Sequence, residues 1–142
     1  DAAPSAPVAD VVVCHHVVYN VAELVPFLIA LSGHARRRVV VELTEKHPLS
    51  SLSPLWLSIH RLERPSSPTS SGAVAIAEAL GYGVHVDRFE ESSTSAKAPI
   101  DERVAFARRK LCAGPEHDEE IASYLSATAD QPEELVTFYW DV

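Results

Sequence analysis

Two adjacent histidines, His15 and His16, follow an apolar run at residues 11–14 and can carry out acid–base chemistry. An imidazole gains and loses a proton near neutral pH, so a histidine in a cleft can remove a proton from a hydroxyl or an amine. Consecutive residues of a strand point to opposite faces, which predicts that His15 and His16 do not bind one metal ion together. The alternative is that one of them is a packed, hydrogen-bonded strand residue. As the base, His16 is preferred to His15.

Glu42 follows a second apolar run, at residues 39–41. A carboxylate at the end of a buried strand must be paired, solvated or protonated, because an unpaired buried charge is costly. Glu42 is therefore a candidate for orienting a bound hydroxyl group or for helping to hold a cation. The alternative prediction is a structural ion pair with Arg61 or Arg64.

Trp56 and His60 stand four residues apart on a predicted short helix and therefore share one of its faces. They are candidates for one wall of a substrate pocket, where the indole would stack on a planar or sugar ring. A core tryptophan beside a capping histidine is the alternative. The remaining histidines lack ligand spacing and are predicted to be loop or surface residues: His34, His47, His85 and His117.

A strand–helix–strand unit positions the first of these residues. The sequence predicts a strand at 9–15, a helix at 23–32 that Gly33 ends, and a strand at 38–43. Asn20 and Glu23 have the spacing of a capping box. The nearly continuous valines of the first strand predict burial on both faces, as in parallel sheets. Ligands of open α/β sheets bind beyond the carboxyl ends of the strands, so the polar residues there mark the expected site.

The rest of the chain predicts further α/β elements within one domain, residues 1–142, whose first eight residues form a loose segment. Residues 46–68 form an inserted loop with a short helix that starts at Ser53 and Pro54. A helix capped by Ser70 or Ser71 follows and ends at Gly81. The remaining predicted elements are an edge strand at 84–89, a helical pair within 100–128, and a terminal strand at 135–142.

The composition argues against several classes of protein. The chain has 142 residues, 46% of them hydrophobic, and a formal net charge of −8, which suits a soluble globular protein and argues against nucleic-acid binding. No apolar run approaches the ~20 residues that span a bilayer, and no signal peptide is visible. Two cysteines without metal-ligand spacing favour a cytoplasmic location. Hydrolase and nucleoside triphosphatase motifs are absent, and none of the five glycines forms a phosphate-binding loop.

The order of elements resembles the carboxyl-terminal half of a class I S-adenosylmethionine (SAM)-dependent methyltransferase. The segments that match its fourth to seventh strands read DVVVCHHVVYNV at 10–21, RRVVVELTE at 37–45, GVHVDRFE at 83–90 and LVTFYWDV at 135–142. The resemblance implies a Rossmann-like α/β fold: a mostly parallel sheet of about four strands, flanked by helices, with the last strand antiparallel between the fifth and sixth. The glycine-rich SAM-binding loop belongs to the amino-terminal half, which has no counterpart here, and residues 34–38 replace the usual Gly-Gly.

The resemblance also implies roles for individual residues. Cys14 and His15 would contact SAM, whereas His16 and Tyr19 would be catalytic and Asn20 would contact the methyl acceptor. Glu42, Trp56 and His60, chosen above from their chemistry and spacing, would complete the acceptor site, and no metal is predicted. The implied activity is methyl transfer to a small-molecule acceptor, with the isolated fragment inactive because it cannot hold SAM.

The resemblance predicts a partner as well. In the family the fourth strand pairs with the first, so the strand at 9–15 would have an open edge that the missing amino-terminal half or a second copy covers, as in a homodimer. One alternative function is a non-enzymatic, flavodoxin-like interaction or dimerisation module, which would have about five strands and use the acidic helical pair as its surface. A metal-binding protein is a third, but it needs convergent ligands that the spacing does not show.

Overall fold

Four strands form one mixed sheet in the computed structural model, which describes residues 6–91, 98–128 and 132–142. The strands are β1 (Ala9–His15), β2 (Ala35–Thr44), β3 (His85–Glu91) and β4 (Glu133–Asp141), in the order β1-β2-β4-β3. β1 is parallel to β2, whereas β4 is antiparallel to β2 and lies between β2 and β3. The α/β class, the number of strands and the antiparallel last strand are therefore as predicted, and β3 is an edge strand.

The contacts divide the chain into two compact units. The first unit comprises Asp1–His47, Ser67–Phe89 and Glu134–Val142, and it contains most of the sheet. The second unit comprises Pro48–Ser66 and Glu90–Glu133. The inserted segment and the helical pair thus belong together in the second unit.

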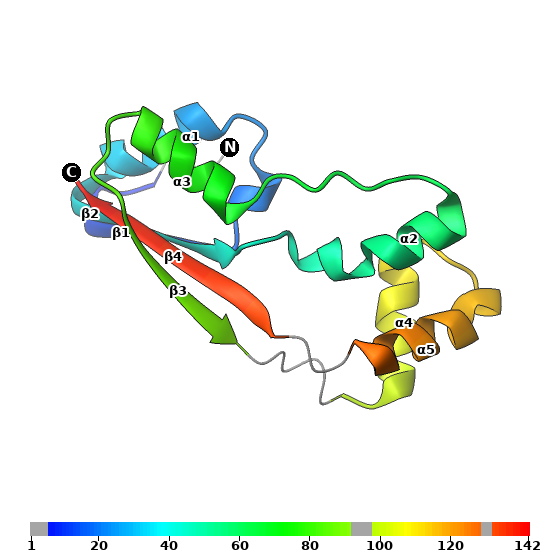
Figure 1. Cartoon of the computed structure of the whole chain (residues 1–142). Helices are drawn as coiled ribbons and strands as arrows, with labels where there is room; N and C mark the ends of the chain where they lie inside the picture. The colour runs from blue at the N-terminus through cyan, green and yellow to red at the C-terminus, as the bar shows by residue number, and fades with distance from the viewer. Residues whose placement is uncertain (1–5, 92–97, 129–131) are drawn as a thin grey trace. The chain divides into compact units, whose positions relative to one another are not determined.

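The first unit has its core on one face of the sheet. α1 (Leu24–His34) and α3 (Ser70–Ala79) pack against each other and both lie on this face (Figure 1). Alternate residues of β2 and β4 point toward the helices, as the period of two in a strand requires. The buried residues of this core are Cys14, Val18, Leu28, Ala35, Val39, Val41, Leu43, Ala73, Ala77, Phe138 and Trp140.

The opposite face of β1 is uncovered. Val11 and Val13 are 47% and 66% exposed, whereas Cys14 on the helix side is buried. The prediction that the valines of this strand are buried on both faces is therefore wrong. The physical reason is that β1 is the edge of the sheet and the helices of its unit cover only one face.

The ends of α1 differ from those predicted. Asn20 belongs to a short 3-10 helix, Val18–Asn20, and the N-cap of α1 is Glu23, without a side-chain hydrogen bond. The helix also continues through Gly33 to His34. A glycine is tolerated inside a helix, because packing of the apolar face outweighs its lower propensity.

The N-cap of α3 is Thr69 rather than Ser70 or Ser71. Its hydroxyl accepts a hydrogen bond of 3.1 Å from the backbone N–H of Gly72. Gly81, in the turn after the helix, has a φ of +85°, which a glycine adopts without steric cost. The predicted stop signal is therefore correct, although the regular helix ends at Ala79.

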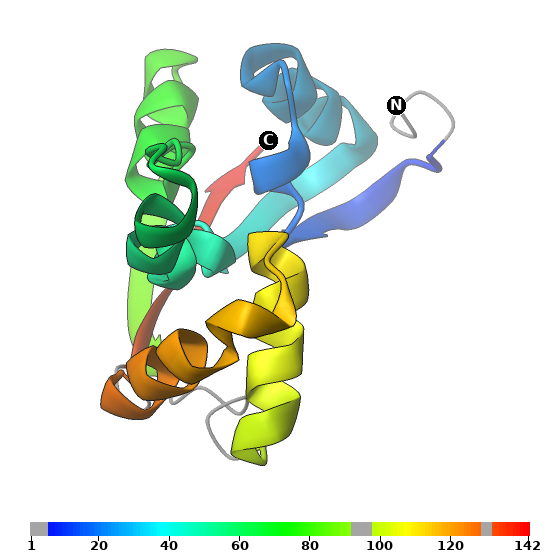
Figure 2. The same ribbon diagram turned by 90° about the vertical axis from the view of Figure 1, so that its right-hand side faces the viewer.

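The second unit is helical. It contains α2 (Ser53–His60), α4 (Ile100–Leu111) and α5 (Asp118–Ala127), with 3-10 helices at Pro48–Leu52 and Pro115–His117. α4 and α5 pack against each other (Figure 2, yellow and orange), so the predicted helical pair is confirmed. The buried residues of this unit are Leu52, Leu55, Val104, Ala107, Leu111 and Ile121. In the part of the chain that the structure describes, every helix is too short or too polar to cross a membrane.

Candidate functional site

His15 and Glu42 meet at the carboxyl ends of two neighbouring parallel strands. The register of β1 and β2 places these residues opposite each other, and His15 Nε2 lies 2.5 Å from Glu42 Oε1. The second carboxylate oxygen of Glu42, Oε2, accepts a hydrogen bond of 2.8 Å from Thr137 Oγ1 on β4. Among the described residues Glu42 is thus paired with His15 and Thr137 inside its own unit, and the alternative ion pair with Arg61 or Arg64 stays a prediction.

His16 does not continue the strand. Its φ is +53°, in the left-handed region, and its backbone N–H donates a hydrogen bond of 2.8 Å to the carbonyl oxygen of Glu42. This turn brings the His16 ring to the side of His15, with 4.3 Å between the ring centroids. The prediction that the two rings point to opposite faces is therefore wrong, because strand alternation ends at His15.

The turn at His16 creates a cluster of possible metal ligands. One ligand atom each from His15, His16 and Glu42 lies within 4.8 Å of the others. The two histidines are exposed and Glu42 is partly buried. The fold thus brings together possible ligands whose convergence the sequence spacing did not show. The prediction of no metal rested on His15 and His16 pointing to opposite faces, and this reason no longer holds.

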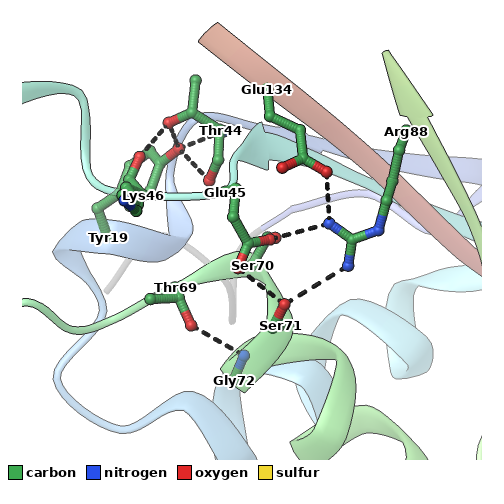
Figure 3. A network of polar contacts seen from close by, with 10 residues as sticks. All are labelled: Tyr19, Thr44, Glu45, Lys46, Thr69, Ser70, Ser71, Gly72, Arg88 and Glu134. Carbon is green, nitrogen blue, oxygen red and sulfur yellow. Dashed lines mark hydrogen bonds and ion pairs between the residues drawn. The ribbon is translucent and has the colours of Figure 1, made fainter. Parts of the chain in front are cut away.

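Tyr19 fixes the loop after β1 to the end of β2. Its hydroxyl forms hydrogen bonds with the hydroxyl, the backbone N–H and the carbonyl oxygen of Thr44 (Figure 3). The Tyr19 ring is stacked 6.3 Å from the His16 ring and contacts the His47 ring edge-on at 5.2 Å. Tyr19 therefore lies next to the cluster, but its hydroxyl is engaged in hydrogen bonds that hold the loop to β2.

Glu45 is the centre of a second polar network beside the first (Figure 3). It accepts hydrogen bonds from Ser70 Oγ and, at 2.8 Å, from Ser71 Oγ, and pairs at 3.1 Å with Arg88. Arg88 also pairs with Glu134 at 2.9 Å. Desolvation by itself would raise the pKa of Glu45, but these hydrogen bonds and the guanidinium together lower it below its ordinary value. The network ties the end of β2 to α3, β3 and β4.

Cys14 and Asn20 differ in accessibility. Cys14 belongs to the hydrophobic core and is 4% exposed, and burial raises the pKa of its thiol, partly offset by a backbone hydrogen bond with Val17. Cys14 is thus a core residue, and its predicted contact with SAM stays a prediction. Asn20 is exposed in the 3-10 helix after β1, so its predicted contact with an acceptor stays a prediction.

Trp56 and His60 lie in the second unit. Their ring centroids are 4.2 Å apart, which confirms that they share a face of α2. His60 Nε2 is 2.7 Å from the carbonyl oxygen of Leu111, and the guanidinium of Arg64 lies 4.1 Å from the centroid of the Trp56 ring. His60 thus has the capping task that was the alternative to substrate binding, and a role of Trp56 toward an acceptor stays a prediction.

Two residues of the site were missed in the sequence. Thr137, which holds Glu42, is 95 positions away, and only the register of β2 and β4 brings the two together. Its only signal is a polar position within the otherwise apolar run at residues 135–140. His47 lies in the loop after β2, as predicted, and its ring contacts Tyr19 there, which the sequence did not indicate.

Comparisons with known proteins extend only to the fold. No protein-family profile and no curated protein matches the sequence. Eight solved chains match, among them a cyclopropane-fatty-acyl-phospholipid synthase-like protein from Lactobacillus casei ATCC 334. It is 11% identical, with a TM-score of 0.56, and the match covers 99% of this chain and 60% of that one. The two share an α/β fold, and this chain spans less than two thirds of the length of its structural neighbour.

Proposed function

We propose that this chain forms the acceptor side of a SAM-dependent methyltransferase that acts on a small molecule. The observation that carries the proposal is the convergence of His15, His16 and Glu42 beyond the carboxyl ends of two adjacent parallel strands. Ligands of open α/β sheets bind at such ends. The shared fold with the cyclopropane-fatty-acyl-phospholipid synthase-like protein and the methyltransferase-like order of elements support it.

Methyl transfer requires a correctly oriented acceptor and the removal of a proton from it. His16 is exposed and is the proposed base, because it directly follows the end of β1 and does not take part in the His15–Glu42 hydrogen bond. Tyr19 forms a wall beside it, and Asn20 and Glu42 are the proposed polar contacts of the acceptor. The acidic chain favours a small acceptor over a nucleic acid.

The described residues do not fit SAM as a complete site. Cys14, one of its two predicted contacts, is a core residue, and none of the glycines forms a phosphate- or nucleotide-binding loop. We therefore infer that SAM is bound by residues outside this chain and that the chain alone is inactive.

The test is calorimetric titration of S-adenosylhomocysteine, the demethylated product of SAM, into two proteins. One is this chain alone, and the other is this chain joined to the sequence that precedes it in its gene. We expect binding and methyl transfer only in the longer protein, in which His16→Ala lowers the transfer rate about 10²- to 10⁴-fold. Micromolar binding of S-adenosylhomocysteine by the chain alone would refute the assignment of SAM binding to residues outside it. Absence of this binding in the longer protein would refute the proposed methyltransferase activity.

The alternative function is a non-enzymatic interaction or dimerisation module. The observation in its favour is the open edge of β1 with the exposed Val11 and Val13. Self-association of both proteins, without binding of S-adenosylhomocysteine by either, would support this alternative over the enzyme.

A further inference from the structure

We propose that His15, His16 and Glu42 together bind one divalent transition-metal ion, with Zn²⁺ as the best-fitting ion. Two imidazoles and one carboxylate are a ligand set that zinc accepts, and three protein ligands leave a fourth tetrahedral position open. Mg²⁺ and Ca²⁺ prefer oxygen ligands, so this nitrogen-rich set selects against them. The inference stands on this geometry and does not depend on the proposed function.

The distances suit a common ion after a small adjustment. Bonds of about 2.0 to 2.2 Å in a tetrahedral site place neighbouring ligand atoms about 3.3 to 3.6 Å apart. The three ligand atoms lie within 4.8 Å of one another, and His15 Nε2 is 2.5 Å from Glu42 Oε1. His15 and Glu42 therefore have to separate by about 1 Å while His16 approaches. Their side chains are 58% and 27% exposed, which leaves room for this rotation.

The backbone and a neighbouring strand hold the ligands in place. His16 is fixed by its left-handed φ and by the hydrogen bond of its N–H to the Glu42 carbonyl. Thr137 donates to the carboxylate oxygen that does not face His15, at 2.8 Å. Such hydrogen bonds behind the ligands orient metal sites, and their loss lowers metal affinity about 10- to 100-fold.

The competing explanation is a plain hydrogen-bonded pair of His15 and Glu42 beside an uninvolved His16. The two explanations differ in what His16 does. If the three residues form a metal site, His16→Ala removes a ligand and lowers the zinc affinity. If His15 and Glu42 are a plain hydrogen-bonded pair, His16→Ala removes no ligand and leaves any zinc binding unchanged. An ion bound here would coordinate a ring nitrogen of His16, so His16 would then act as a ligand and not as the base of the proposed methyl transfer.

The experiment is calorimetric titration of Zn²⁺, with Mg²⁺ in parallel, into the chain carrying Cys112→Ser, because Cys112 is an exposed thiol. We expect one zinc ion per chain, no binding of Mg²⁺, and a loss of zinc affinity of at least about tenfold in each of His15→Ala, His16→Ala and Glu42→Gln. Thr137→Val is expected to lower the affinity about tenfold, and Thr137→Ser to restore it. Circular dichroism shows whether each variant is folded.

Two histidine controls separate this site from adventitious binding. His85→Ala removes an exposed histidine from β3 and is expected to leave the affinity unchanged. His117 lies 3.8 Å from Glu116 and 3.4 Å from Glu120, so His117→Ala tests adventitious zinc binding by a second histidine with carboxylates nearby. Absence of zinc binding at millimolar concentration, or binding that His117→Ala removes and His16→Ala does not, would overturn the proposal. Because no SAM is present, its failure is distinct from that of the proposed function.

Discussion

A hydrogen bond of 2.5 Å joins His15 Nε2 to Glu42 Oε1, and these residues are direct partners in the register of β1 and β2. The bond is thus a product of parallel strand pairing, not of a loop conformation. Thr137 holds the other oxygen of Glu42, so this carboxylate connects three neighbouring strands. A site on such elements is more rigid than one on loops, as binding and catalysis require.

Tyr19→Phe should destabilise the protein by about 1 kcal/mol, the typical net worth of a hydrogen bond. The hydroxyl of Tyr19 is bound to Thr44 and ties the loop after β1 to the end of β2. Chemical denaturation measures the change in the free energy of unfolding. Tyr82→Phe is the matched control, because the Tyr82 ring stacks on Trp140 while its hydroxyl has no hydrogen bond among the described residues. Equal stabilities of the two variants would contradict the structural role of Tyr19.

Glu45→Gln should lower the free energy of unfolding at pH 7 by about 1 to 2 kcal/mol, because hydrogen bonds to a charged group are lost or weakened. Ser70, Ser71 and Arg88 all contact this carboxylate. Glu134→Gln weakens the interaction with Arg88 alone and should cost less. Thermal and urea unfolding of the two variants give the comparison, and a larger effect of Glu134→Gln would contradict the network.

The same residue predicts a pH dependence. The pKa of Glu45 is lower in the folded than in the unfolded chain, so its charged form stabilises the fold above the unfolded value, about 4.3. This contribution disappears as the pH falls through the lower folded value. Between pH 7 and pH 3 the wild type should therefore lose more stability than Glu45→Gln does. Parallel losses in the two proteins would show that Glu45 is not the group responsible.

Cys14 and Cys112 should differ sharply toward a thiol reagent such as 5,5′-dithiobis(2-nitrobenzoate). Cys14 is buried, with a raised thiol pKa, whereas Cys112 is exposed at the end of α4. Only the thiolate reacts, so one thiol per native chain should react promptly and both should react in guanidinium. Cys112→Ser should abolish the fast reaction. A fast reaction of Cys14 would show that its thiol is accessible and would favour its predicted contact with SAM.

The sequence predicted the positions of the strands better than it predicted which strand faces are buried and which residue caps a helix. Apolar runs located β1, β2 and β4 because buried strands need them, whichever elements cover them. The exposure of Val11 and Val13 depends on which face the helices cover, and a run of valines carries no information on that. The cap at Thr69 was missed because three consecutive hydroxyl residues compete for it, and Ser70 and Ser71 bind Glu45 instead.

The candidate site was predicted only in part. His15, His16 and Glu42 were found because polar residues follow apolar strands. Their convergence was missed because it depends on the positive φ of His16. Residues other than glycine rarely adopt such an angle, so the sequence gives no reason to expect it. The role of Thr137 depends on a pairing between distant strands, so it requires the register of the sheet.

The open edge of β1 predicts that the chain self-associates. In the described part of the chain β1 pairs with β2 alone and exposes Val11 and Val13, and an apolar edge strand is prone to pair with another chain. Light scattering should therefore give a mass above the 15.5 kDa of one chain. Val13→Lys should restore the monomer, because a charged side chain on an edge strand opposes pairing, and a surface change of this kind alters stability by only about 0.5 kcal/mol.

Val86→Lys places the same charge on β3, the other edge of the sheet, where Val86 is 38% exposed. This variant should keep the mass of the wild type, because the association is assigned to β1. A monomeric wild type would contradict the prediction outright. If Val86→Lys dissociates the assembly and Val13→Lys does not, the contact lies on β3, and β1 needs no partner to remain stable in water.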